Sequence, residues 1–118
     1  MDKEARPPGK TTVAPDVLIE IARMAALKVA GVSGMAPVSG GVNRLFRRGI
    51  GDGVRITIEE DTVFADIYLI LENGINIRDT SRNIQKKVTR AIHEMVGMDV
   101  GGVNIHIEDI AYETASEA

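Results

Sequence analysis

Two neighbouring runs of alternating apolar and polar residues, at 54–59 and 62–72, constrain the fold of this chain more than any other feature. The first run alternates Val54, Ile56 and Ile58 with polar side chains, the period of two expected of a strand with one solvated face. The second run, TVFADIYLILE, places apolar side chains on both faces, which is typical of a central strand covered on both sides. The acidic pair Glu60 and Asp61 separates the runs, so the sequence predicts an antiparallel hairpin.

A pattern with the period of a helix follows at residues 76–97. Asn76 can accept hydrogen bonds from the first free N–H groups, Asp79 stands in the first turn, and Gly97 can end the helix. At about 100° per residue, one arc of this helix is apolar and the opposite arc is basic. The apolar arc holds Ile84, Val88, Ala91, Ile92 and Met95, and the basic arc holds Arg78, Arg82, Lys86 and Arg90, with His93 beside them. We expect the apolar arc to pack on the sheet and the four basic residues to form an exposed row, the basic stripe.

The remaining apolar segments predict another helix and another strand. A helix should begin near Pro15 and Asp16, because proline is tolerated in the first turn and Asp16 can accept hydrogen bonds from free N–H groups there. It should end at Gly31, and it is apolar around most of its circumference, so we expect it to be largely buried. The alternation in GGVNIHIEDIAYE predicts a strand after the second helix, and strand, helix and strand in succession favour parallel pairing through a right-handed crossover.

These elements predict an α+β fold. Two main helices should pack on a mixed sheet of three to four strands, in the order (β)αββαβ, where the bracketed strand is a short extended piece before the first helix. We expect a disordered leader at residues 1–10, one domain at 11–113 with a glycine-rich loop at 31–53, and a flexible tail at 114–118. A chain of 118 residues with 44% apolar composition can bury one modest core.

Composition also narrows the functional classes. The absence of cysteine excludes disulfides and thiolate metal sites. No run has the character of a signal peptide or approaches the roughly 20 apolar residues of a membrane span, so a cytoplasmic location is the default expectation. Aromatic residues are scarce, which disfavours a surface on which nucleic-acid bases stack.

Charge is unevenly distributed along the chain. Residues 76–98 carry five basic and two acidic residues, a net charge of +3, whereas the whole chain carries -3, so the rest carries -6. The acidic residues concentrate at 54–72 and 99–118. A molecule with opposite charge on two regions can bind acidic surfaces or associate head to tail with copies of itself.

The glycine-rich segment does not match a nucleotide-binding loop. It precedes a strand rather than a helix, and Val54 stands where the last glycine of a dinucleotide fingerprint would be. GVSGM lacks the last glycine of a nucleophile elbow, and the two histidines give no metal-binding spacing, so we expect no enzyme, no metal and no cofactor. GVSG does match the G-x-x-G spacing of RNA-binding KH modules, which we keep as the alternative.

A second basic cluster lies within the same segment. NRLFRR places Arg44, Arg47 and Arg48 around Leu45 and Phe46. A short amphipathic turn of this kind can dock on a partner or a membrane surface, and equally its apolar pair can anchor the loop to the core.

Taken in order, these stretches resemble the alkaline shock protein family of envelope stress response proteins, common in Gram-positive bacteria. The resemblance covers residues 11–113 and rests on the helix running into GVSGM, the hairpin, and NIRDTSRNIQKKVTRAIHEMVGMDVGGVNIHIEDIAYE. It implies a small cytoplasmic, non-enzymatic protein with no active-site residues to carry over. It also implies a role in envelope homeostasis or in alkaline and other stress. Some members lie beneath the membrane through a membrane-embedded anchor partner, and others are linked to lipid metabolism.

We therefore predict a non-enzymatic interaction protein of the envelope stress response. The predicted interaction residues are Arg78, Arg82, Lys86 and Arg90, with Arg44, Phe46, Arg47 and Arg48 as a second set. We expect the basic stripe to meet an acidic surface, either on a membrane-anchor protein or on the acidic hairpin of a neighbouring copy. A KH-like RNA-binding module is the alternative.

Overall fold

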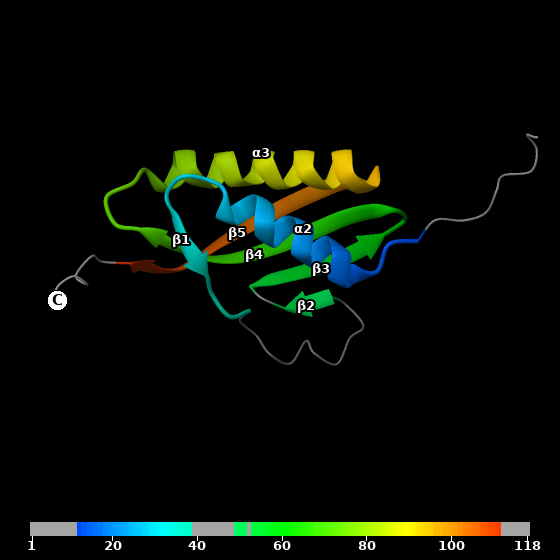
Figure 1. Ribbon diagram of the computed structural model, residues 1–118, viewed down its shortest axis with the longest axis horizontal. Coiled ribbons are helices and arrows are strands. Elements are labelled where there is room, and N and C mark those ends of the chain that lie inside the picture. Colours follow the sequence, from blue (N-terminus) through cyan, green and yellow to red (C-terminus); the bar gives the residue numbers. More distant parts are fainter. Residues whose placement is uncertain (1–11, 39–48, 52, 112–118) are drawn as a thin grey trace, which may run out of the picture.

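Strand β4 is the centre of a five-stranded mixed sheet (Figure 1). The structure is a computed structural model that describes residues 12–38, 49–51 and 53–111. The α+β class and the mixed sheet predicted from the sequence are confirmed. Along the chain the elements are α2 (Pro15–Leu27), β1 (Val32–Met35), β2 (Gly49–Gly51), β3 (Val54–Glu59), β4 (Thr62–Glu72), α3 (Ile77–Val96) and β5 (Asp99–Ala111).

The two edges of β4 have different partners. β5 runs parallel to β4 along one edge, as the sequence predicts. On the other edge, β3 pairs antiparallel with residues 62–67 and β1 pairs antiparallel with residues 69–71. The N–H of Tyr68 donates to the carbonyl of Gly53, and the carbonyl of Tyr68 accepts from the N–H of Ala36. Because both groups of Tyr68 point to the same edge, β3 and β1 lie end to end along it, and β2 extends the sheet beyond β3.

Local signals set the hairpin and α3 as the sequence predicts. Glu60 and Asp61 both adopt positive φ, 51° and 65°, the conformation of two-residue turns whose twist matches that of a hairpin. The side chain of Asn76 accepts a hydrogen bond from the N–H of Asp79 at 2.9 Å, and Gly97 ends α3 with φ of 76°. The segment that carries the basic stripe is therefore fixed at both ends by its own residues.

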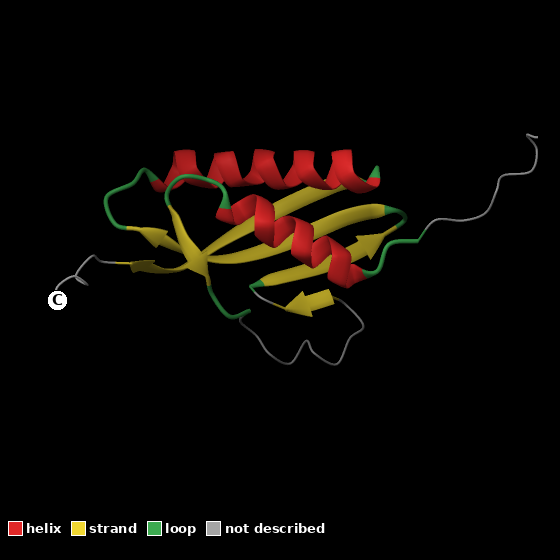
Figure 2. Ribbon diagram, in the orientation of Figure 1, coloured by secondary structure: helices red, strands yellow, loops and turns green. Residues whose placement is uncertain are grey.

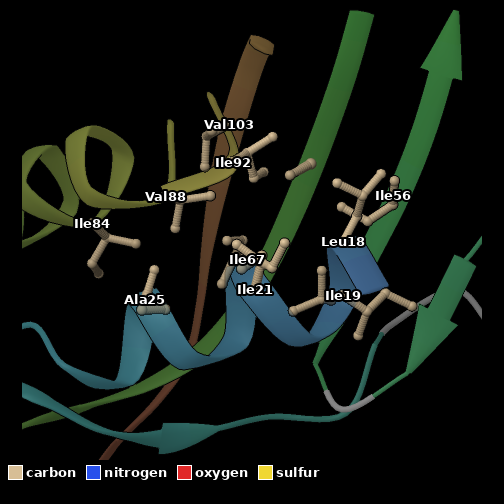
Figure 3. Close-up of a cluster of buried hydrophobic side chains, with 14 of the residues drawn as sticks. Leu18, Ile19, Ile21, Ala25, Ile56, Ile67, Ile84, Val88, Ile92 and Val103 are labelled. Atoms are coloured by element: carbon tan, nitrogen blue, oxygen red, sulfur yellow. The ribbon is translucent and has the colours of Figure 1, made fainter. Parts of the chain in front are cut away.

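Both helices pack on the same face of the sheet, where the core lies (Figure 2). Figure 3 shows Leu18 and Ile21 of α2 and Ile84, Val88, Ile92, Ile67 and Val103 gathered between the helices and the strands. The prediction that β4 is covered on both sides is confirmed only in part. On its other face Tyr68 is 3% exposed, but Phe64 is 37% exposed, and no helix of the described chain packs there.

Helix α2 is shorter than predicted. It ends at Leu27 rather than at Gly31, because the next two N–H groups donate to carbonyls three residues earlier, which tightens the last turn. Its N-cap is Ala14, so Asp16 stands in the first turn without a capping hydrogen bond. The chain then turns through Gly31, whose φ of 101° suits glycine, into β1.

The predicted loop at 31–53 contains two strands, β1 and β2, so the sheet has five strands rather than three or four. β1 has no alternating pattern and includes a shift in register, so its pairing with β4, rather than its own sequence, makes it a strand. Residues 12–14 belong to no strand, and the extended piece expected before the first helix does not join the sheet.

Candidate interaction surface

The basic stripe lies on the side of α3 that points away from the core. The buried residues of α3 recur every four positions, at Thr80, Ile84, Val88 and Ile92. The opposite side of the helix therefore faces solvent. Arg78, Arg82, Lys86, Arg90 and His93 are all exposed. The amphipathic arrangement predicted for α3 is therefore present.

Met95 is the exception to the predicted apolar arc. Its side chain is 68% exposed, although the helical period places it in line with the buried residues. The reason is its position in the last turn of α3, where it borders a groove between α2 and α3 instead of the sheet.

Few charges of the stripe have an ion-pair partner in the described part of the chain. Arg90 Nε lies 3.9 Å from Glu94 Oε2, and both side chains are largely exposed, at 74% and 67%, an arrangement that contributes little to stability. Within the described part of the chain, Arg78, Arg82 and Lys86 form no ion pair. These cations are therefore available to an anionic partner.

A shallow groove beside the stripe adds one cation from the end of α2, the C-cap residue Lys28. It has a volume of about 830 Å³ and opens between the C-terminal end of α2 and the middle of α3. Its charged lining is entirely basic: Lys28, Lys86, Lys87 and Arg90, with His93 at the same groove. Lys28 was not predicted, because only the packing of α2 on α3 brings it to the stripe.

The other two sequence signals have different outcomes. Arg44, Phe46, Arg47 and Arg48 lie outside the described residues, so the second predicted cluster stays a prediction. The GVSG motif at 31–34 leads from the turn after α2 into β1, whereas a KH loop joins two helices. The structure thus lacks, in these residues, the local arrangement that would support the RNA-binding alternative.

A polar network that the sequence did not reveal occupies the uncovered face of the sheet. One oxygen of Asp66 accepts from Asn104 Nδ2 at 3.2 Å and lies 3.0 Å from His106 Nε2, and the other lies 3.7 Å from Arg55 Nε. Arg55 donates to the Tyr68 hydroxyl at 2.5 Å, and the Tyr68 ring stacks on His106 with 4.3 Å between centroids. Strand register brings these residues together. Asp66 lies between Arg55 on β3 and Asn104 on β5. Tyr68 lies opposite His106 on β5.

In this network the polar side chains of one sheet face bind mainly to one another. His106 and Glu108 do not share a regular strand face, because the register shifts there: Ile107 pairs with Leu69 and Asp109 with Ile70. Across residues 12–38, 49–51 and 53–111, no three His, Asp or Glu side chains gather as a metal site requires. We interpret the network as a feature that holds the strands in register.

Fold and surface define this chain as a small α+β protein with an exposed cationic helix face. It belongs to the alkaline shock protein 23 family, which has a cell envelope-related function and whose family model matches residues 3–112. The resemblance seen in the sequence is confirmed. Among the helices of the described residues, none is both long and apolar enough to cross a membrane.

Relatives cover nearly the whole chain. YqhY of Bacillus subtilis strain 168 is 29% identical over 119 residues, which span 99% of this chain and 88% of YqhY. A protein of Streptococcus pyogenes serotype M6 is 35% identical over 108 residues, which span 89% of this chain and 81% of that protein. Among solved structures, a variant of MamM-CTD has a TM-score of 0.50 at 14% identity and covers 80% of this chain and 95% of that chain. At this identity the likeness shows the fold alone.

Proposed function

We propose that this chain is a non-enzymatic interaction protein of the envelope stress response or envelope homeostasis, which binds an acidic surface of a protein partner at the membrane. The basic stripe carries the proposal, because it presents four exposed cations on one helix face of a chain whose net charge is -3. The cell envelope-related function of the family supports the setting. In this proposal the protein is cytoplasmic and lies at the inner face of the membrane, where the partner supplies the anchor.

The spacing of the stripe indicates what kind of acidic surface fits. Arg78, Arg82, Lys86 and Arg90 follow one another at four-residue intervals, so the row is about 18 Å long at roughly 1.5 Å per residue. Three of the four are arginines, whose planar guanidinium groups bind carboxylates in a bidentate manner. An acidic helix or an extended acidic segment of the partner matches this length.

Single exposed ion pairs are weak, so the stripe must act as a set. Each pair contributes roughly 0.2–1 kcal/mol, and complementary charge raises association rate and specificity more than affinity. We therefore expect binding that weakens as salt is added and that depends on several of the cations together.

The test is capture of partners by the tagged full chain from detergent-solubilised membranes of the source organism, with quantitative mass spectrometry. The double variant Arg82→Glu/Lys86→Glu should lower the amount of captured membrane protein by at least roughly tenfold. The reason is that the four cations of the stripe become two cations and two anions. Lys3→Glu/Lys10→Glu is the matched control, since it changes the net charge equally in the segment before α2. This control should capture the same proteins as the wild type.

Two further outcomes identify the partner class. If the partner is the hairpin of a neighbouring copy, Glu59→Lys/Glu60→Lys should abolish the larger assemblies that the wild type forms, because Glu59 and Glu60 are exposed at the β3–β4 turn. Salt-sensitive binding of single-stranded RNA would instead support the RNA-binding alternative. Unchanged capture together with unchanged assembly size in Arg82→Glu/Lys86→Glu would overturn the proposal.

A further inference from the structure

The groove between α2 and α3 exposes apolar side chains that the fold does not use. This helix groove has a volume of about 820 Å³ and is lined by residues of α2 and α3. Val17 and Met24 from α2 and Met95 from α3 line it, and they are 47%, 46% and 68% exposed. Together they form an apolar strip between two helices, which is more than the scattered apolar residues found on any protein surface. We infer that the helix groove is the interface for a second copy of this chain, docked by two-fold symmetry.

Charges on the rim of the helix groove are mainly acidic at one end and basic at the other, with Arg90 one turn before Glu94. α2 and α3 run in roughly opposite directions (Figure 1), and residues from the start of α2 and from the end of α3 line the same groove. The acidic end of the groove holds Asp16, Glu20 and Glu94. Lys28 and Lys87 lie toward the other end, where the C-terminal end of α2 meets α3.

Several of these charges have no ion-pair partner among the residues that the structure describes. Glu20 pairs with Arg23, and Glu94 lies 3.9 Å from Arg90. Among the described residues, Asp16, Lys28 and Lys87 form no ion pair. The unpaired charges are therefore negative at one end of the groove and positive at the other.

A two-fold axis through the middle of the groove makes this pattern complementary to itself. The rotation places Asp16 of one copy against Lys28 and Lys87 of the other, twice, and it places the apolar strip against the same strip. Met24 and Met95 suit such a contact, because flexible methionine side chains adapt to an opposing apolar surface. A membrane surface would not fit equally well, because anionic lipid headgroups favour basic residues around the rim and one end of this rim is acidic.

The first experiment measures the mass of the full chain in solution by light scattering after size exclusion, from about 1 μM to about 500 μM. The wild type should pass from monomer to dimer within this range. Met24→Glu/Met95→Glu should stay monomeric, because each charge would be buried in the apolar strip. Met24→Leu is the matched control and should dimerise. Both methionines are exposed, so circular dichroism should show the same fold in every variant.

The second experiment tests the two-fold geometry by charge exchange. Asp16→Lys alone and Lys28→Glu alone should each weaken the dimer by roughly tenfold, because each creates like charges across the axis. Asp16→Lys/Lys28→Glu/Lys87→Glu in one chain should restore it, since all the opposed charges are then exchanged together. A wild type that is monomeric at every concentration, or a triple variant that is not restored, would overturn the inference.

These measurements are independent of the proposed function. Arg82→Glu/Lys86→Glu alters the basic stripe and should leave the mass of the groove dimer unchanged. If the stripe variant abolishes dimerisation while Met24→Glu/Met95→Glu does not, the groove is not the interface, and the stripe proposal is unaffected.

Discussion

The two faces of β4 are stabilised by different kinds of interaction. On the face beneath the helices, Val63, Ala65, Ile67, Leu69 and Leu71 are each 0% exposed. On the other face, polar contacts link the strand to β3 and β5, and no described helix covers it. The first face is stabilised by burial, which has no direction, and the second by contacts that require particular distances and partners. A substitution should therefore have a large effect on the first face, and an effect that depends on specific partners on the second.

The largest expected effect is at the centre of the covered face. Ile67→Ala should lower the free energy of unfolding by about 2–5 kcal/mol, because Ile67 is fully buried and the cavity left behind cannot close completely. Urea denaturation followed by circular dichroism measures this loss. Ile58→Ala is the matched control, because Ile58 is 38% exposed at the hairpin end of β3, and it should cost less than about 1 kcal/mol. Equal losses at the two positions would contradict the contrast between buried and exposed sites.

On the uncovered face, the ring of Phe64 lies against the glycines at the start of β5. A Cβ added at Gly101 would lie 2.6 Å from Phe64 Cζ, too close for a real contact, so the ring or the strand must shift. Gly101→Ala should lower the free energy of unfolding by about 1–3 kcal/mol.

A double-mutant cycle shows whether the ring is the cause. In a Phe64→Ala background the Gly101→Ala penalty should fall without vanishing, because the opposing ring is gone while Thr62 Cγ2 still lies 2.9 Å from the added Cβ. The same denaturation measurement applies to all four proteins of the cycle. If the two changes are additive within about 0.5 kcal/mol, Phe64 does not press on this glycine and β5 is held there by other contacts.

Sequence reasoning succeeded where the structure depends on local signals. The alternation in 54–72, the cap at Asn76 and the glycine at 97 each act within a few residues, so the hairpin, α3 and the exposed position of the stripe could be predicted. β1 could not, because its conformation depends on pairing with residues 69–71, far along the chain.

The polar network was missed for the same physical reason. Asp66 and His106 are 40 positions apart, and only the parallel register of β4 and β5 brings them within 3.0 Å. A pattern of alternation shows which face a residue occupies but not which residue stands beside it on the next strand. Lys28 reaches the basic groove through helix packing, which the pattern of α2 alone does not specify.

The smallest effect is expected for Asp66→Asn on the uncovered face. This substitution removes a charge and changes the volume of the side chain very little, so it tests the polar contacts without creating a cavity. Asp66→Asn should lower the free energy of unfolding by about 1–2 kcal/mol, since the carboxylate accepts from Asn104, contacts His106 and lies beside Arg55. Glu59→Gln, at an exposed carboxylate of the same sheet, should change stability by less than about 0.5 kcal/mol. If the two substitutions cost the same, the Asp66 carboxylate adds nothing to folding. The uncovered face would then be held by backbone pairing together with the Arg55–Tyr68 hydrogen bond and the Tyr68–His106 stack, which Asp66→Asn does not remove.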